Sequence, residues 1–241
     1  MPNSFAPKLL AEFIGTFALV FIGAGAASIV GGAAGGGITA VAFAHGLTLM
    51  IFICAYGSIS GGHMNPAVTV GVLAAGAITA AEAVSYIVSQ IAGGVAAALL
   101  LRIVLGGVAT GLGTPELAHG LVLGGAPVTI TPAIGFMVEA VLAFFLVTVV
   151  LSTAVAGRAA HLAPVAIGLT LVFNILMGGA LTGAAFNPAR ALGPMIVTGN
   201  LGDAWLYVLA PIVGAIIAAV FHTGLSVLTH ERPAAVAASA E

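Results

Sequence analysis

The sequence predicts an all-α membrane protein with six transmembrane helices and two re-entrant half-helices, arranged as an inverted repeat. Of its 241 residues, 61% are hydrophobic and only 5% are charged, whereas an ordinary soluble domain carries roughly 25% charged residues. The chain contains six apolar segments of about 20 residues or more, which is the length that spans a bilayer. It also resembles itself at a spacing of 122 residues. These three observations indicate that its functional residues lie within the membrane.

The composition excludes several other classes of protein. Five Lys and Arg against seven Asp and Glu give a net charge of −2, so we expect no nucleic-acid partner. A single cysteine excludes a disulfide within the chain and a cysteine-based metal site. His, Cys and Asp residues do not cluster at the spacings of metal ligands or of a catalytic centre. We therefore expect no metal, no cofactor and no enzyme activity.

Breaks at glycine, proline and charged residues separate the six apolar segments. We expect transmembrane helices near residues 7–30, 38–59, 80–105, 129–152, 161–180 and 203–228. The first segment is longer than a signal-peptide core and has no clear cleavage site, so we expect it to be retained as a span. Residues 1–241 are interpreted as a single membrane domain, in which the Ala-rich residues 233–241 form a disordered tail.

The internal repeat indicates a duplication with inverted topology. In positions 46–71, eleven of 26 residues are identical to those 122 positions later, including Gly46 with Gly168. We place repeat one at about 7–105 and repeat two at about 129–228. Each repeat has three spans, an odd number, so the second copy must enter the membrane from the opposite face.

Two short apolar segments, near 65–76 and 187–198, each begin with Asn-Pro. Asn is a favoured helix N-cap and Pro a favoured first residue, so each segment starts a helix that is too short to cross the membrane. Inverted symmetry brings the two helix N-termini together near the midplane. Each N-terminus carries about half a positive charge, and such a pair repels cations. The side-chain amides of Asn65 and Asn187 are expected to donate hydrogen bonds to a passing oxygen atom.

Residues 60–69 read Ser-Gly-Gly-His-Met-Asn-Pro-Ala-Val-Thr, and residues 183–190 read Gly-Ala-Ala-Phe-Asn-Pro-Ala-Arg. Together with a Glu in the first span of each half, they resemble the paired Asn-Pro-Ala signatures of the aquaporin (major intrinsic protein) family. The resemblance covers nearly the whole chain. It implies a homotetrameric passive channel for water and small neutral solutes, such as ammonia, urea or hydrogen peroxide, which excludes protons and ions. The implied pore motifs are Asn65, Pro66, Ala67, Asn187, Pro188 and Ala189.

The same resemblance assigns the narrowest, outward-facing part of the pore to His45, Ile175, Ala184 and Arg190. Arg190 follows Asn187 by three residues and so lies within one helical turn of it, and an arginine inside a membrane is expected to be functional. The set is similar to that of plant vacuolar-membrane (tonoplast) aquaporins. We expect His45 and Arg190 to form a polar pair opposite Ile175, with His45 as a hydrogen-bond donor; His45 as a packed core residue is the alternative.

Two other functions are compatible with the sequence. A glycerol-facilitator channel typically has two aromatic residues opposite the filter Arg and an Asp after it, whereas Ala191 follows Arg190 here. An ion-coupled secondary transporter can also be built from inverted repeats with broken helices. It needs titratable groups near the midplane, and besides two glutamates the chain offers only His45 and His63 there.

Those glutamates, Glu12 and Glu139, lie in the first span of each repeat. An ionised carboxylate in a membrane is costly unless it is hydrogen-bonded. We expect backbone N–H groups of the re-entrant segments, and His63, to be the partners. Both glutamates are therefore interpreted as supports for the re-entrant loops.

The positive residues predict the orientation of the chain. Lys8, Arg158 and Arg232 fall on the face that holds both termini, and Arg102 falls on the other. Positive residues favour the cytoplasmic side, so we expect cytoplasmic termini and location in the plasma (inner) membrane.

Cys54 is expected to pack against a neighbouring helix. Ala184 occupies the position that carries a pore cysteine in some aquaporins, so mercurials should inhibit weakly.

Overall fold

The structure is a computed structural model that describes residues 5–31 and 36–228. Within these residues, six helices are long and apolar enough to cross a membrane, which confirms the predicted fold class and an integral membrane protein. The first and fourth spans each contain a π-helical turn. The spans are α1–η1–α2 (Ala6–Ala18, Leu19–Ala24, Gly25–Val30), α3 (Gly37–Ser60), α5 (Ala80–Val104), α6–η4 (Pro132–Val150, Leu151–Val155), η5–α7 (Ala160–Leu162, Ala163–Thr182) and α9 (Ala204–Leu228).

The two half-helices are α4 (Pro66–Ala74) and α8 (Pro188–Thr198). Asn65 caps α4 by accepting a hydrogen bond from the N–H of Ala67, 2.8 Å away. Asn187 caps α8 by accepting from the N–H groups of the second and third residues of that helix. In both helices the proline occupies the first position, where its missing N–H costs nothing. The predicted starts of both half-helices are therefore confirmed.

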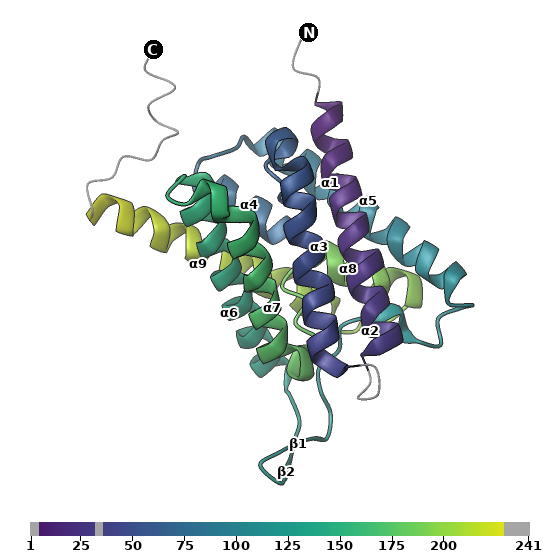
Figure 1. Cartoon of the computed structure of the whole chain (residues 1–241). Coiled ribbons are helices and arrows are strands. Elements are labelled where there is room, and N and C mark those ends of the chain that lie inside the picture. The colour runs from purple at the N-terminus through teal and green to yellow at the C-terminus, as the bar shows by residue number, and fades with distance from the viewer. Residues whose placement is uncertain (1–4, 32–35, 229–241) are drawn as a thin grey trace, which may run out of the picture.

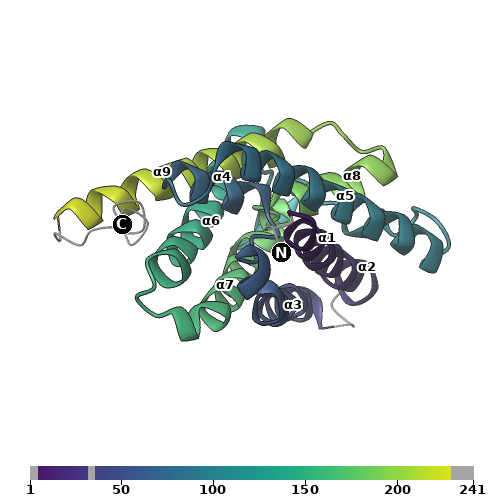
Figure 2. The ribbon, with the colours of Figure 1, turned by 90° about the horizontal axis from the view of Figure 1, so that it is seen from above.

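Each half-helix packs against a span of the other repeat: α4 contacts α9, and α8 contacts α5. The spans α3 and α7 also cross closely, at Gly46 and Gly168. A side chain on either glycine would meet the backbone carbonyl oxygen of the other, so this crossing requires two residues without a Cβ. Figures 1 and 2 show the long helices packed side by side and tilted against one another. The two repeats thus form one helical body.

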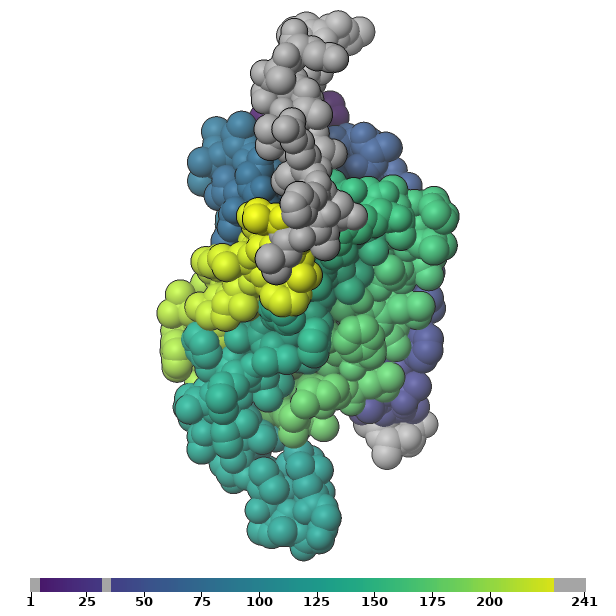
Figure 3. All heavy atoms as spheres, turned by 90° about the vertical axis from the view of Figure 1, so that its left-hand side faces the viewer, coloured from purple at the N-terminus to yellow at the C-terminus, as the bar shows by residue number. Residues whose placement is uncertain are grey.

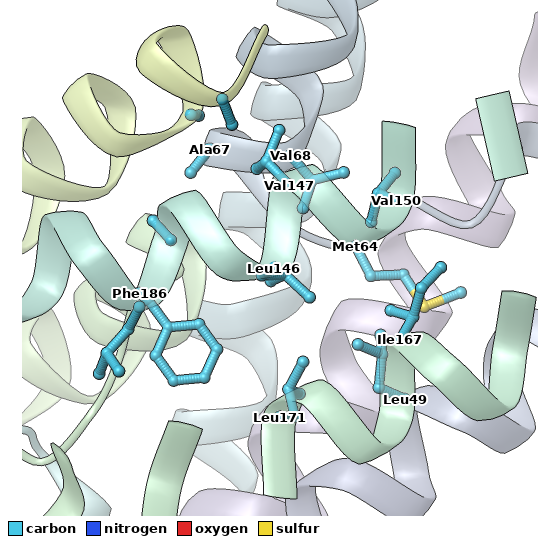
Figure 4. Close-up of a cluster of buried hydrophobic side chains, with 14 of the residues drawn as sticks. Leu49, Met64, Ala67, Val68, Leu146, Val147, Val150, Ile167, Leu171 and Phe186 are labelled. Carbon is cyan, nitrogen blue, oxygen red and sulfur yellow. The ribbon is translucent and has the colours of Figure 1, made fainter. Parts of the chain in front are cut away.

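An apolar core joins the two repeats next to the half-helices. Figure 4 shows Leu49 and Val68 of the first repeat facing Leu146 and Leu171 of the second. All four side chains are buried. Other members of the same buried cluster, such as Ala67 of the first repeat and Val147 and Ala215 of the second, hold the two repeats together, as close-packed interiors do.

The connection between α5 and α6 contains a short 3₁₀ turn η3 (Gly111–Gly113) and a β-hairpin. Strands β1 (Leu121–Leu123) and β2 (Ala126–Val128) pair antiparallel. The two residues between them, Gly124 and Gly125, both have positive φ, as the tight turns that suit a hairpin require. The hairpin projects from the helical body (Figures 1 and 3).

The alternating spans put Lys8, at the start of α1, and Arg158, in the α6–α7 connection, on one face of the molecule. Arg102 lies near the opposite face, in the last turn of α5. Arg232 and the tail 233–241 lie outside the described residues. Cys54 of α3 is exposed, so it is not covered by a neighbouring helix of the same chain, contrary to the expectation from the sequence.

Candidate functional site

Glu12 holds the loop that precedes α4. Its Oε1 accepts hydrogen bonds from the Ser60 hydroxyl (2.6 Å) and the His63 N–H (2.9 Å). Its Oε2 accepts from the Met64 N–H (2.5 Å) and the Gln90 amide (2.7 Å). The carboxylate is fully buried, and these four donors replace the water that it lacks in the membrane.

Glu139 holds the loop that precedes α8 in the same way. Its Oε1 accepts from the Thr182 hydroxyl (2.6 Å) and the Ala185 N–H (3.0 Å), and its Oε2 from the Phe186 N–H (2.5 Å). This carboxylate is also fully buried. Three of the donors to Glu12, from Ser60, His63 and Met64, thus have counterparts 122 positions later on Glu139, whereas the Gln90 donor to Glu12 has none among the hydrogen bonds of Glu139.

His63 differs from its expected role in one respect. Its backbone N–H reaches Glu12, but its ring does not serve as the partner of that carboxylate. The ring Nδ1 lies 3.1 Å from the hydroxyl oxygen of Thr69 instead. This arrangement follows from the loop geometry, which turns the backbone of residues 63 and 64 toward Glu12 and leaves the ring beside α4.

Two tyrosines that the sequence did not single out also support the loops before the half-helices, one tyrosine for each loop. Tyr86 of α5 donates a hydrogen bond from its hydroxyl to the Ser60 carbonyl (2.8 Å). Tyr207 of α9 donates to the Thr182 carbonyl (2.6 Å). Both side chains are buried. The sequence does carry a signal for this pair, because the tyrosines are 121 positions apart, close to the repeat spacing.

The two half-helices are tied to each other at their N-termini. The Asn65 amide donates to the Phe186 carbonyl (3.0 Å), and the Asn187 amide donates to the Met64 carbonyl (2.9 Å). Each asparagine therefore uses one of its two amide N–H groups to hold the other repeat. The second N–H of each amide remains for another acceptor.

A narrow cavity runs past these N-termini. It is lined by Asn65, Asn187 and the four residues expected in the narrow part of a pore: His45, Ile175, Ala184 and Arg190. Its volume is about 40 Å³. A water molecule needs about 10–15 Å³ of such space, so the cavity holds a few waters. Much of the remaining lining is apolar. It includes Leu49, Val68, Leu146, Val150, Ile167 and Leu171.

A second cavity of about 340 Å³ lies next to the first and is lined in part by the α5–α6 connection. Thr110, Thr114 and Glu116 line it, and Arg190 lines both cavities. Arg190 is 4% exposed. Its guanidinium therefore stands at the junction of a wider outer space and a narrower inner one.

The two polar residues at this junction are held by backbone carbonyls. Arg190 donates from Nη1 to the Gly113 carbonyl (2.8 Å). The Nδ1 atom of His45 lies 2.9 Å from the Val41 carbonyl. A carbonyl can only accept, so Nδ1 carries the proton, and in the neutral ring Nε2 is an acceptor. The expectation that His45 supplies a donor is therefore wrong for the neutral ring.

The described residues thus combine six spans, two half-helices that meet end to end, and a cavity that passes their junction. This combination is the architecture of an inverted-repeat membrane channel. The chain belongs to the major intrinsic protein family, whose family model matches residues 2–222.

Curated relatives include plant and bacterial members of the family. The chain is 39% identical to aquaporin TIP4-4 of Zea mays over 225 residues, which cover 90% of this chain and 85% of that protein. It is 40% identical to glycerol uptake facilitator protein-like 6 of Lactiplantibacillus plantarum, over 88% of this chain and 94% of that protein. Among solved structures, the aquaglyceroporin of Plasmodium falciparum matches with a TM-score of 0.78 at 22% identity, covering 91% of this chain and 96% of that one. That likeness concerns the fold alone.

Proposed function

We propose that this protein is a passive channel for water and small neutral solutes, with ammonia, urea and hydrogen peroxide as candidates, and that it excludes protons and ions. The observation that carries the proposal is the narrow cavity that passes Asn65 and Asn187 and ends at Arg190. Its size suits a few water molecules. Its apolar lining, interrupted by a few polar groups, suits neutral solutes.

Exclusion of ions follows from charge that is fixed along the cavity. The N-termini of α4 and α8 meet there, each with about half a positive charge. Arg190 adds a full positive charge in a region of low dielectric constant. The free amide N–H groups of Asn65 and Asn187 can each donate to a water oxygen. A water held by both would have its lone pairs occupied and could not relay a proton along the chain of waters.

Selectivity among neutral solutes is assigned to His45, Ile175, Ala184 and Arg190. Arg190 donates hydrogen bonds, whereas Nε2 of neutral His45 accepts them, and Ile175 presents only hydrocarbon. A solute that both donates and accepts, such as water, ammonia or urea, can exchange hydrogen bonds with both polar residues as it passes. A solute that lacks either group would lose hydrogen bonds on entry.

Glycerol is the second candidate substrate, because one relative is named a glycerol uptake facilitator-like protein. The lining of the narrow part argues against glycerol as the main substrate, since Ile175 and Ala184 offer no aromatic surface. Ion-coupled transport is disfavoured by the two buried glutamates, because each already accepts at least three hydrogen bonds from the protein.

Proteoliposomes containing the purified protein test the function directly. Stopped-flow light scattering after osmotic shock with sucrose, urea or glycerol measures water and solute entry, and an internal pH dye measures ammonia entry. We expect water and urea flux that is linear in the gradient and indifferent to sodium and pH, well above that of empty liposomes. Saturation together with dependence on sodium or protons would overturn the proposal in favour of coupled transport.

We further propose that the chain forms one channel domain of two repeats, assembles as a homotetramer and lies in the plasma (inner) membrane with cytoplasmic termini. Lys8 and Arg158 on one face support the orientation. Large apolar side chains exposed on the outer surfaces of the spans, such as Ile103 and Val220, suit contact with lipid or with other copies. Native mass spectrometry and accessibility of tags at the termini test these statements.

A further inference from the structure

The first span contains a π-helical turn, Leu19–Ala24, between two α-helical stretches. Turns of this kind are rare and are often found at functional sites. Here the last two residues of the turn, Gly23 and Ala24, are buried, and each contacts a different part of the junction between the two cavities.

Gly23 lies directly against the ring of His45. A Cβ added at Gly23 would overlap ring atoms Cγ, Cδ2 and Nε2 of that histidine. His45 lines the inner cavity, and its ring is held by Val41 on its own helix. The ring therefore stands between α1 and the cavity, and a side chain at position 23 would push it toward the cavity.

Ala24 supports the segment that holds Arg190. Gly113 packs so closely on Ala24 that a Cβ at Gly113 would overlap the Ala24 backbone, and Gly113 has φ of +67°. The neighbouring Leu112 is fully buried in a cluster that includes Val20 and Ala24. These contacts with α1 fix the position of the Gly113 carbonyl, which accepts the hydrogen bond from Arg190.

We propose that the π-helical turn Leu19–Ala24 positions both polar residues of the narrow part, and that Gly23 and Ala24 are specificity-determining positioning residues. Gly23 determines how far the His45 ring extends into the cavity. Ala24 determines the position of the Gly113 carbonyl that accepts the hydrogen bond from Arg190. The inference rests on the proposed function, because it takes His45 and Arg190 as the selective part of a pore.

The first test is Gly23→Ala, measured in proteoliposomes with protein confirmed to be inserted. Since overpacking displaces neighbouring groups, we expect urea permeability to fall by about fivefold or more, with water permeability falling less. The decisive step repeats the substitution in a His45→Ala background. There the added methyl group has no ring to displace, so the ratio of urea to water permeability should change by less than about 1.5-fold.

The matched control is Ile22→Ala, in the same turn. Ile22 is 46% exposed on the outer surface of the protomer, so its substitution should leave the ratio unchanged. The second test is Ala24→Val, which pushes Gly113 away from α1 and releases Arg190. Urea and glycerol permeability should then rise relative to water, and Arg190→Val should remove this effect.

Each outcome decides the inference. Equal effects of Gly23→Ala with and without His45, or no effect of Gly23→Ala and Ala24→Val, would overturn it. Insertion of the Gly23→Ala/His45→Ala protein where Gly23→Ala alone fails would support it, and failure of both would overturn it. If His45→Ala and Arg190→Val themselves leave selectivity unchanged, the assigned filter fails, whereas altered selectivity without coupling to Gly23 overturns only the role of the turn.

Discussion

Asn65 of the first repeat donates its side-chain amide to the backbone carbonyl of Phe186 in the second repeat, at 3.0 Å. The reciprocal bond, from Asn187 to the Met64 carbonyl, is 2.9 Å long. The same asparagines cap the half-helices with their carbonyl oxygens. Each side chain therefore joins a helix start to the opposite repeat, and this link fixes the two N-termini end to end.

Substitution of Asn65 by Ala removes the cap and leaves the Phe186 carbonyl unpaired in a buried site. We expect a loss of about 2–4 kcal/mol in the free energy of unfolding, the sum of the two effects. Denaturant unfolding in detergent measures it. The control is Asn200→Ala, which removes an exposed amide that donates to Glu116. Similar losses in both variants would contradict the special role of Asn65.

Glu12→Gln tests whether the buried carboxylate organises the loop before α4. The carboxylate oxygens of Glu12 accept four hydrogen bonds. The NH₂ group of Gln cannot accept and would face some of these donors, so we expect the free energy of unfolding to fall by about 3 kcal/mol. The comparison is Glu82→Gln, which breaks the partly exposed pair with Lys8 and should cost no more than about 1 kcal/mol. Equal thermal stability of the Glu12→Gln protein and the unsubstituted protein would refute the assigned role.

Mercurials should leave water flow through the unsubstituted protein nearly unchanged. Cys54 is exposed and lines neither cavity described above. In Ala184→Cys the new thiol would face the inner cavity, so mercury should block water flow and a reducing thiol should restore it. Strong, reversible block of the unsubstituted protein, or resistance of Ala184→Cys, would show that Ala184 is misplaced in the pore.

Features governed by local rules could be predicted from the sequence. The Asn-Pro pairs specify both half-helix starts, because capping and a proline at the first position depend on adjacent residues alone. The repeat at 122 residues then implies the inverted arrangement, since two similar halves that each contain an odd number of spans must enter the membrane from opposite faces.

Features set by tertiary packing could not be predicted. The π-helical turn at Leu19–Ala24 has no distinguishing residue, and the contact of Gly23 with His45 appears only once α1 and α3 are packed. The hairpin at 121–128 uses Gly124 and Gly125, but the surrounding loop contains several other glycines that fit a turn equally well. The ring nitrogen of His45 that carries the proton is determined by its contact with the Val41 carbonyl, and this contact depends on the side-chain rotamer, which the sequence does not specify.

The central claim is that His45 and Arg190 select the solutes that pass, while the opposed half-helices maintain a separate barrier to protons. The most direct measurement compares unsubstituted, His45→Ala and Arg190→Val proteins in proteoliposomes for water, urea, glycerol and proton permeability. His45→Ala should raise urea or glycerol entry while water flow persists, and Arg190→Val should also increase proton leak without abolishing proton exclusion. If both inserted variants keep the solute selectivity and proton leak of the unsubstituted protein, His45 and Arg190 do not form the filter.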